Sequence, residues 1–151
     1  EKYINENSVV ADLGCGSGIL SIISLLLGAK SAFAVDIDEN AIKTAYENAE
    51  LSGVDISRYY VTSGNVIGDK ALQDEIGYDK YDVVVANIIA DVICAISPVV
   101  PAQLKKGGVF IASGIIKDRM QDVYEALDKC GLKVINTAAK DEWVCITSVK
   151  E

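Results

Sequence analysis

A chain of 151 residues, half of them hydrophobic, is long enough to fold as one domain around a sizeable core. Its formal charge of −8 argues against a broad nucleic-acid surface, which needs clustered Lys and Arg, and suits a basic protein partner better. Since the sequence contains no histidine, it excludes Ser-His-Asp hydrolases, Cys-His proteases and histidine-ligated zinc sites, and it favours chemistry with little proton transfer.

Short apolar runs alternate with helical periods, which predicts an α/β fold with a mostly parallel sheet and helices on both faces. Five strands are expected near residues 8–13, 31–36, 58–62, 81–87 and 108–114. Four helices are expected near residues 17–27, 39–52, 89–104 and 117–130. Two final strands, 133–136 and 143–149, should form an antiparallel hairpin at the edge of a seven-stranded, Rossmann-like sheet.

Glycine, proline and aspartate mark the expected ends of the helices. Glycines lie where helices should stop, at Gly28, Gly53, Gly107, Gly108 and Gly131. Asp38 can cap the helix that opens at Glu39. Pro98 and Pro101 should divide the fourth helix into two short pieces, because an interior proline removes a hydrogen bond and clashes with the preceding turn.

The turn between the first strand and the first helix carries Gly14, Gly16 and Gly18. Glycine at every second position permits positive φ angles and lets a nucleotide-like ligand approach, and the free N–H groups at the helix start point at such a ligand. In a dinucleotide fingerprint the third glycine follows the second by three residues, but here it follows by two and Ile19 fills the expected slot. The spacing argues against NAD and favours S-adenosylmethionine; a merely flexible loop is the alternative.

Two acidic residues accompany this turn. Asp12 lies two residues before Gly14 at the carboxyl end of the first strand, where its carboxylate can bind the ammonium group of a methionine moiety directly or through water. Asp36 ends the second strand twenty-two residues after Gly14, where a βαβ unit places the acceptor for ribose hydroxyls. We predict both as cofactor contacts.

Asn87 follows a valine-rich strand and reaches its carboxyl end, the edge where ligands bind in open parallel sheets. Its alternative role is to cap the helix that follows. Level with Gly14 and Asp36, its amide can donate and accept hydrogen bonds, and so orient an incoming amine and the cofactor together. We predict Asn87 as the catalytic residue and a cofactor contact, and nominate no general base.

The end of the third strand, Ser63-Gly64-Asn65-Val66, is the expected place for an adenine base. Asn65 or the neighbouring backbone should bond the ring edge while Ile37 packs on its face. An ordinary loop turned by Gly64 is the competing interpretation.

Six segments together resemble the catalytic domain of bacterial ribosomal protein L11 methyltransferases: DLGCGSGILS at 12–21, VDID at 35–38, ENAELSGV at 47–54, ANIIA at 86–90, SGII at 113–116 and EWV at 142–144. The glycine loop is shared by many class I methyltransferases, of which the hairpin ending is typical, so the last three segments make the resemblance specific. It implies transfer of methyl groups from S-adenosylmethionine, with S-adenosylhomocysteine as product, to the α-amino group and lysine ε-amino groups of that ribosomal protein. It also implies cofactor contacts at Gly14, Asp36 and Asn87.

Family members carry an amino-terminal substrate-recognition domain and a closing loop rich in glycine and threonine, and this sequence shows neither pattern. We therefore expect residues 1–151 to be the catalytic domain alone. Two alternatives stay open: a non-catalytic cofactor-binding module, and a methyltransferase for a small molecule or an amide. Amide methyltransferases usually have Pro-Pro-Tyr after the asparagine, where this chain has Ile88-Ile89-Ala90.

The cellular setting is expected to be cytoplasmic, without a membrane partner. No apolar run reaches the ~20 residues of a membrane span, and the first residues lack a signal-peptide pattern. The four cysteines form no Cys-x-x-Cys pair, which predicts reduced thiols and no metal site.

Overall fold

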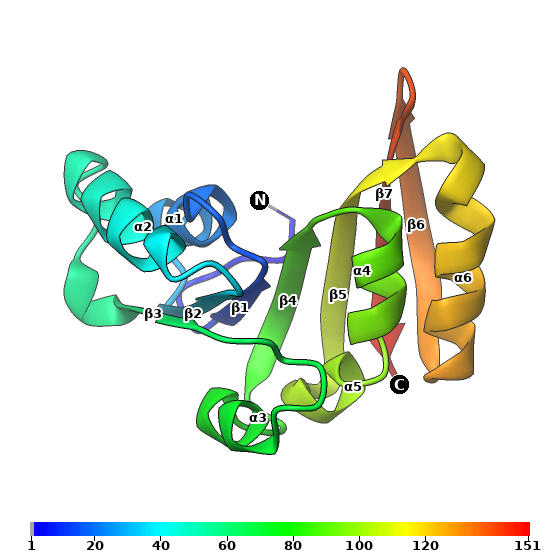
Figure 1. Cartoon of the computed structure of the whole chain (residues 1–151), viewed down its shortest axis with the longest axis horizontal. Helices are drawn as coiled ribbons and strands as arrows, with labels where there is room; N and C mark the ends of the chain where they lie inside the picture. The colour runs from blue at the N-terminus through cyan, green and yellow to red at the C-terminus, as the bar shows by residue number, and fades with distance from the viewer. Residues whose placement is uncertain (1) are drawn as a thin grey trace.

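The computed structural model describes residues 2–151 as a seven-stranded sheet with helices on both faces (Figure 1). The strands are β1 (Val9–Leu13), β2 (Ser31–Asp36), β3 (Tyr59–Ser63), β4 (Tyr81–Asn87), β5 (Leu104–Ile116), β6 (Leu132–Lys140) and β7 (Trp143–Lys150). The helices are α1 (Ile19–Leu26), α2 (Asn40–Leu51), α3 (Lys70–Ile76), α4 (Ala90–Ile96), α5 (Val100–Gln103) and α6 (Met120–Lys129), with short 3₁₀ turns at Ile56–Arg58 and Lys117–Arg119. The predicted fold class is confirmed.

The strand order across the sheet is β3-β2-β1-β4-β5-β7-β6. β1 pairs in parallel with both β2 and β4, whereas β7 pairs antiparallel with β5 and β6, so the predicted hairpin at the sheet edge is confirmed. The chain builds outward from β1 to β3 and then returns to place β4 on the other side of β1. This reversal is a topological switch point, and in open α/β sheets ligands bind in the crevice beyond the carboxyl ends of the strands there.

The central strands supply two separate cores. In β4, Val83 and Val85 pack with α1 and α2 on one face, whereas Val84 and Ala86 pack with α3 to α6 on the other. A parallel strand that is covered on both faces needs a nearly continuous apolar run, which explains the valines of β4. Each buried valine contributes roughly 1.5–3 kcal/mol, so the two rows hold the ends of the strands, and the loops that follow them, firmly in place.

Most of the predicted helix ends are found in the structure. Glycines with positive φ lie just beyond α1, α2 and α6, at Gly28, Gly53 and Gly131. α2 begins at Asn40, one residue later than predicted, and its N-cap position belongs to Glu39. Asp38 is therefore not the cap, but its carboxylate accepts a hydrogen bond from the Asn40 N–H at 2.9 Å and so still supports the start of α2. The fourth helix is divided at the prolines, since α4 ends at Ile96 and α5 carries Pro101 in its first turn.

The stop predicted at Gly107 and Gly108 is wrong, because α5 already ends at Gln103 and both glycines lie inside β5. Leu104 pairs with Tyr81, but the regular pairing resumes only at Val109, so the intervening residues form an irregular bulge. Gly107 supplies a positive φ of 76° there. Its conformational freedom serves the bend of the strand and not a helix end.

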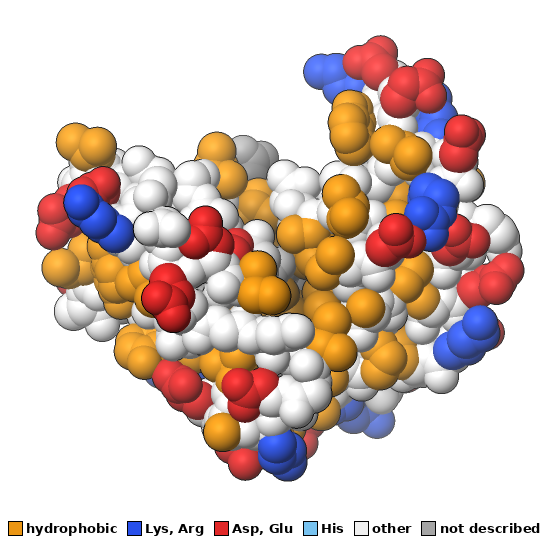
Figure 2. Space-filling model, viewed as in Figure 1, with side chains coloured by type: hydrophobic (Ala, Val, Ile, Leu, Met, Phe, Trp, Pro, Cys, Tyr) orange, Lys and Arg blue, Asp and Glu red, His pale blue; other side chains and the backbone are white. Residues whose placement is uncertain are grey.

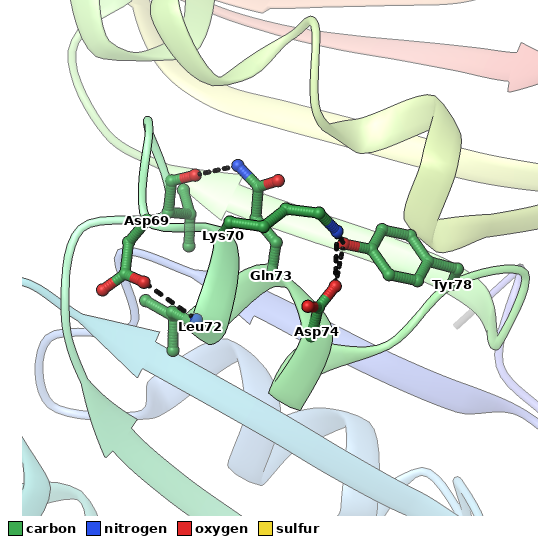
Figure 3. Close-up of polar contacts among 7 residues, drawn as sticks. Asp69, Lys70, Leu72, Gln73, Asp74 and Tyr78 are labelled. Atoms are coloured by element: carbon green, nitrogen blue, oxygen red, sulfur yellow. Dashed lines mark hydrogen bonds and ion pairs between the residues drawn. The ribbon is translucent and has the colours of Figure 1, made fainter.

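Helix α3 was not predicted, although its start carries a recognisable signal. The Asp69 carboxylate caps it by accepting a hydrogen bond from the Leu72 N–H at 3.0 Å (Figure 3). Lys70, Asp74 and Tyr78 form a polar cluster on its exposed side. The Gln73 amide donates to the Val66 carbonyl oxygen at 2.8 Å, so α3 fixes the loop that follows β3.

The β6–β7 hairpin projects past the carboxyl ends of β4 and β5 (Figure 1). Across residues 2–151, the structure contains no helix with both the length and the apolar character needed to cross a bilayer.

Candidate functional site

A pocket of about 550 Å³ opens at the carboxyl ends of β1, β2 and β4, at the switch point of the sheet. Its lining is mainly apolar and comprises Leu13, Gly14, Val35, Asp36, Ile37, Gly64, Asn65, Val66, Ile67, Ile88, Ile89, Val92 and Ile96. Figure 2 shows hydrophobic side chains gathered over α4 and the neighbouring strand ends on this face. Hollows of about 630 and 800 Å³ beside α6 are larger, but they lie away from the switch point, so we place the site in the smaller one.

The glycine turn adopts the backbone that its sequence predicts, with φ angles of 76° at Gly14, 51° at Gly16 and 79° at Gly18. A Cβ on Gly14 would lie 2.7 Å from Ile88 Cγ2, and one on Gly18 would lie 2.5 Å from the Tyr59 hydroxyl oxygen. A Cβ on Gly16 would meet no atom of the described residues within 4 Å, so only the positive φ angle favours glycine at this position. Of the three, Gly14 lines the pocket.

Several backbone donors of this turn and of the helix start already have partners inside the protein. The Gly14 and Cys15 N–H groups donate to the Val35 carbonyl oxygen, at 2.8 and 3.1 Å. In the first turn of α1 the Ser21 N–H donates to the Asp12 carboxylate at 3.0 Å. The expectation that the N–H groups at the helix start are free is therefore wrong for Ser21, because a carboxylate from β1 takes up this donor.

Asp36 lies on the pocket wall at the end of β2. Its Oδ2 accepts a hydrogen bond from the Gly16 N–H at 2.7 Å and its Oδ1 accepts one from the Asp38 N–H at 3.0 Å. The two bonds fix the carboxylate, and each of its oxygens keeps a lone pair for a further donor. Asp36 can therefore accept hydroxyl groups of a ligand while it holds the glycine turn in place.

Asp12 is almost completely buried, with 1% of its surface exposed, and does not line the pocket. Its Oδ2 accepts hydrogen bonds from both the N–H and the hydroxyl of Ser21. Burial raises its pKa to about 6, against the lowering effect of the Ser21 hydrogen bonds. The structure thus gives Asp12 a role at the start of α1, and contact with an ammonium group remains a prediction.

The buried carboxyl of Asp12 makes stability depend on pH. Because its folded-state pKa lies above the ordinary value of 3.8, Asp12 favours folding most when protonated, and this contribution is lost as the pH rises from about 4 to about 6. We expect the free energy of unfolding of the Asp12→Asn variant to rise by about 2 kcal/mol relative to the wild type between pH 4 and pH 7. Urea unfolding at each pH measures this difference.

A control for this experiment is Asp55→Asn, at an exposed turn. Hydrogen bonds from Ser57 lower the pKa of Asp55, so its stabilising contribution is present at neutral pH and is lost as the pH falls. Above pH 4 this contribution is almost fully present, so the stability of the control relative to the wild type should change little between pH 4 and 7 and should rise only as the pH falls below about 4. If the difference in free energy of unfolding between Asp12→Asn and the wild type stayed constant with pH, the raised pKa of Asp12 would be contradicted.

Asn87 is exposed at the end of β4, and Ile88, which follows it, lines the pocket. The N-cap position of α4 belongs to Ile89, so the alternative role of Asn87 as cap of that helix is not found in the described chain. A Cβ on Gly114 of β5 would lie 2.7 Å from the Asn87 Oδ1 atom. Gly114 therefore leaves room for the Asn87 amide, which is not itself part of the pocket lining.

Asn65 and Ile37 both line the pocket, from the loops that follow the neighbouring strands β3 and β2. The Asn65 Oδ1 atom accepts a hydrogen bond from the Ile67 N–H at 3.0 Å, which closes a turn. The amide nitrogen of Asn65 takes no part in this hydrogen bond. Ile37 is 73% exposed, so its side chain is accessible to a ligand in the pocket. Their placement fits the predicted adenine position, which remains a prediction.

The residues of the pocket fit an S-adenosyl group. Asp36 offers a fixed carboxylate for a ribose diol, Gly14 permits close approach of a ligand to the backbone, and Ile37, Val66 and Ile67 offer apolar surface for a flat ring. Sequence reasoning missed the apolar wall formed by Val92 and Ile96, which lie four residues apart on α4 and could have been found by that period.

A protein-family model described as "Ribosomal protein L11 methyltransferase (PrmA)" matches residues 1–151. A ribosomal protein L11 methyltransferase of Agathobacter rectalis is 47% identical over 154 residues, which cover 99% of this chain and 47% of the relative. A crystal structure of a ribosomal protein L11 methylase from Lactobacillus delbrueckii subsp. bulgaricus has a TM-score of 0.86 at 29% identity and covers 99% of this chain and 74% of that one.

The fold is also shared with more distant proteins. An RNA methyltransferase from Salinibacter ruber, solved in complex with S-adenosyl-L-homocysteine, has a TM-score of 0.72 at 19% identity and covers 98% of this chain and 84% of that one. The chain spans about half the length of the curated relatives that it matches.

Proposed function

Since the chain belongs to the ribosomal protein L11 methyltransferase family, we propose that it binds S-adenosylmethionine and transfers methyl groups to amino groups of ribosomal protein L11. The family match over the whole chain is the observation that carries this proposal. The pocket supports it, because its carboxylate, glycine turn and apolar walls suit an S-adenosyl group. We propose residues 1–151 as the catalytic part of such an enzyme, and the acceptors as the α-amino group and lysine ε-amino groups.

S-adenosylmethionine supplies, when bound, an electrophilic methyl group on a positively charged sulfur. The main task of the protein is then alignment, which can contribute ~7–11 kcal/mol when the reacting atoms are held ~3–3.5 Å apart. In the proposed arrangement Asp36 holds the ribose, and Asn87, which directly precedes the lining residue Ile88, accepts a hydrogen bond from the incoming amine and donates one to the cofactor. The net charge of −8 supports a basic protein as the partner.

The amine must lose its proton before it attacks. No histidine is present to accept it, and burial raises the pKa of the Cys15 thiol in the glycine turn to about 12, so this thiol is not a base at neutral pH. The apolar side chains of Ile88, Ile89 and Val92 can desolvate the amine, which lowers its pKa and releases the proton to water. The proposal therefore assigns Asn87 a positioning contact with the amine, without a proton-transfer role.

Calorimetric titration with S-adenosylhomocysteine and with NAD tests the proposed cofactor. We expect S-adenosylhomocysteine to bind and NAD to bind more weakly or not at all, because the third glycine follows the second by two residues. Tighter binding of NAD would overturn the proposal.

A structure of the complex with S-adenosylhomocysteine tests the adenine position. We expect the ring edge to bond Asn65 or the adjacent backbone, and the ring face to pack on Ile37, because both residues line the pocket at the ends of the neighbouring strands β2 and β3. An adenine farther than one water-bridged contact from both residues would refute this placement.

A further inference from the structure

Three polar side chains meet inside the apolar core between β1, α1 and β3. Asp12, Ser21 and Tyr59 are 1%, 0% and 4% exposed. The Ser21 hydroxyl lies 2.9 Å from the Asp12 Oδ2 and 2.9 Å from the Tyr59 hydroxyl oxygen. Burying such groups costs free energy that apolar side chains of similar size would not cost, so their presence calls for a reason other than stability.

The available protons fix the direction of these hydrogen bonds. The Gly18 carbonyl oxygen, which also lies near the Ser21 hydroxyl, already accepts the Ile22 N–H at 2.9 Å. The Ser21 hydroxyl therefore donates to the charged Asp12 carboxylate, the stronger acceptor. The Ser21 oxygen then accepts a hydrogen bond from the Tyr59 hydroxyl. A series of hydrogen bonds therefore runs from Tyr59 through Ser21 to the Asp12 carboxylate.

This series of hydrogen bonds ends at the glycine turn. Gly18 occupies the N-cap position of α1 and has no side chain with which to cap it. Asp12, which lies on β1, caps the helix instead, because its carboxylate accepts a hydrogen bond from the Ser21 N–H in the first turn of α1. The Tyr59 hydroxyl lies against Gly18, where a Cβ would be only 2.5 Å away. The cluster thus determines where α1 begins and how Gly18 is held.

We infer that Ser21 and Tyr59 are positioning residues that hold the glycine turn in the conformation that binds the ligand. The turn has three residues at positive φ within five positions, so it depends on its surroundings for a single conformation. A turn ordered in advance spares the ligand the cost of ordering it. This inference rests on the proposed function of the pocket.

Tyr59→Phe tests the inference, because it removes one hydroxyl and keeps the ring. The matched control is Tyr81→Phe: Tyr81 is also buried, and its hydroxyl donates to the Ile76 carbonyl oxygen at 2.6 Å, at the opposite end of β4 from the pocket. Both variants should lose similar thermal stability. We expect Tyr59→Phe alone to raise the Kd for S-adenosylhomocysteine, by roughly three- to ten-fold, the factor that one lost hydrogen bond produces.

Ser21→Ala and the double variant complete the test. If both residues act through one hydrogen bond, the loss of affinity in the double variant should not exceed that of Ser21→Ala, since the effects of coupled residues do not add. A Kd for Tyr59→Phe within twofold of the wild type, or an equal rise for Tyr81→Phe, would overturn the inference.

Hydrogen exchange in the ligand-free protein separates this inference from the proposed function. The Ser21 amide should exchange faster in Tyr59→Phe than in the wild type and should be unchanged in Tyr81→Phe. Unchanged exchange in Tyr59→Phe would overturn the positioning role, whatever the ligand. A wild-type protein that fails to bind S-adenosylhomocysteine would instead overturn the proposed function.

Discussion

Asn87→Asp is expected to reduce methyl transfer at least ~10²-fold while the protein folds with near-normal stability, because misplacing a reacting group has an effect of this size. The substitution keeps the shape of the side chain but removes the amide donor and adds a negative charge beside the pocket. The assay measures methyl incorporation into ribosomal protein L11 by the full natural chain, with a thermal melt alongside.

The control for Asn87 is Asn136→Asp, the same chemical change at an exposed position on the edge strand β6. Its activity should equal that of the wild type. Asn87→Ala should also fold with little loss of stability, since Ile89 and not Asn87 holds the N-cap position of α4. Activity of Asn87→Asp within a few-fold of the wild type would remove Asn87 from the site.

Asp36→Ala should weaken binding of S-adenosylhomocysteine by roughly 1.5–3 kcal/mol, the range for hydrogen bonds to a charged group, or about 10- to 150-fold in Kd. The loss has two sources in the structure. The ribose hydroxyls lose their proposed acceptor, and the Gly16 N–H loses the Oδ2 atom that now accepts it at 2.7 Å. Isothermal titration calorimetry measures the change.

Asp38→Ala is the control for Asp36, because Asp38 lies two residues farther along and bonds the start of α2. It should cost about 1 kcal/mol of stability, as one lost hydrogen bond does, and leave the Kd unchanged. Asp36→Asn keeps one oxygen for the Gly16 N–H, so it should bind better than Asp36→Ala. Equal affinity of Asp36→Ala and the wild type would exclude the ribose contact.

Local patterns in the sequence were sufficient to predict all seven strands and most of the helices and helix ends. The alternation of apolar runs with helical periods places Gly14, Asp36 and Asn87 each at the carboxyl end of a strand, and parallel strands bring such ends to one edge. The short polar segment 70–76 was missed as a helix because its capping aspartate, Asp69, stands before only two core residues, Leu72 and Ile76. Such a helix depends on packing more than on its own pattern.

The sequence by itself therefore determined which groups lie at the carboxyl edge of the sheet, a glycine turn, an acid and an amide, because each follows a strand that the apolar pattern predicts. Their order across the sheet, with the acid of β2, then the glycine turn of β1, then the amide of β4, was decided by the tertiary structure. The tertiary structure alone decided which way the side chains point. Asp12 turns inward to Ser21, and Tyr59, 38 residues after Ser21 in the chain, completes their hydrogen bonds. These contacts join three elements across the core, and no local pattern specifies them, since their directions are set by how those elements pack.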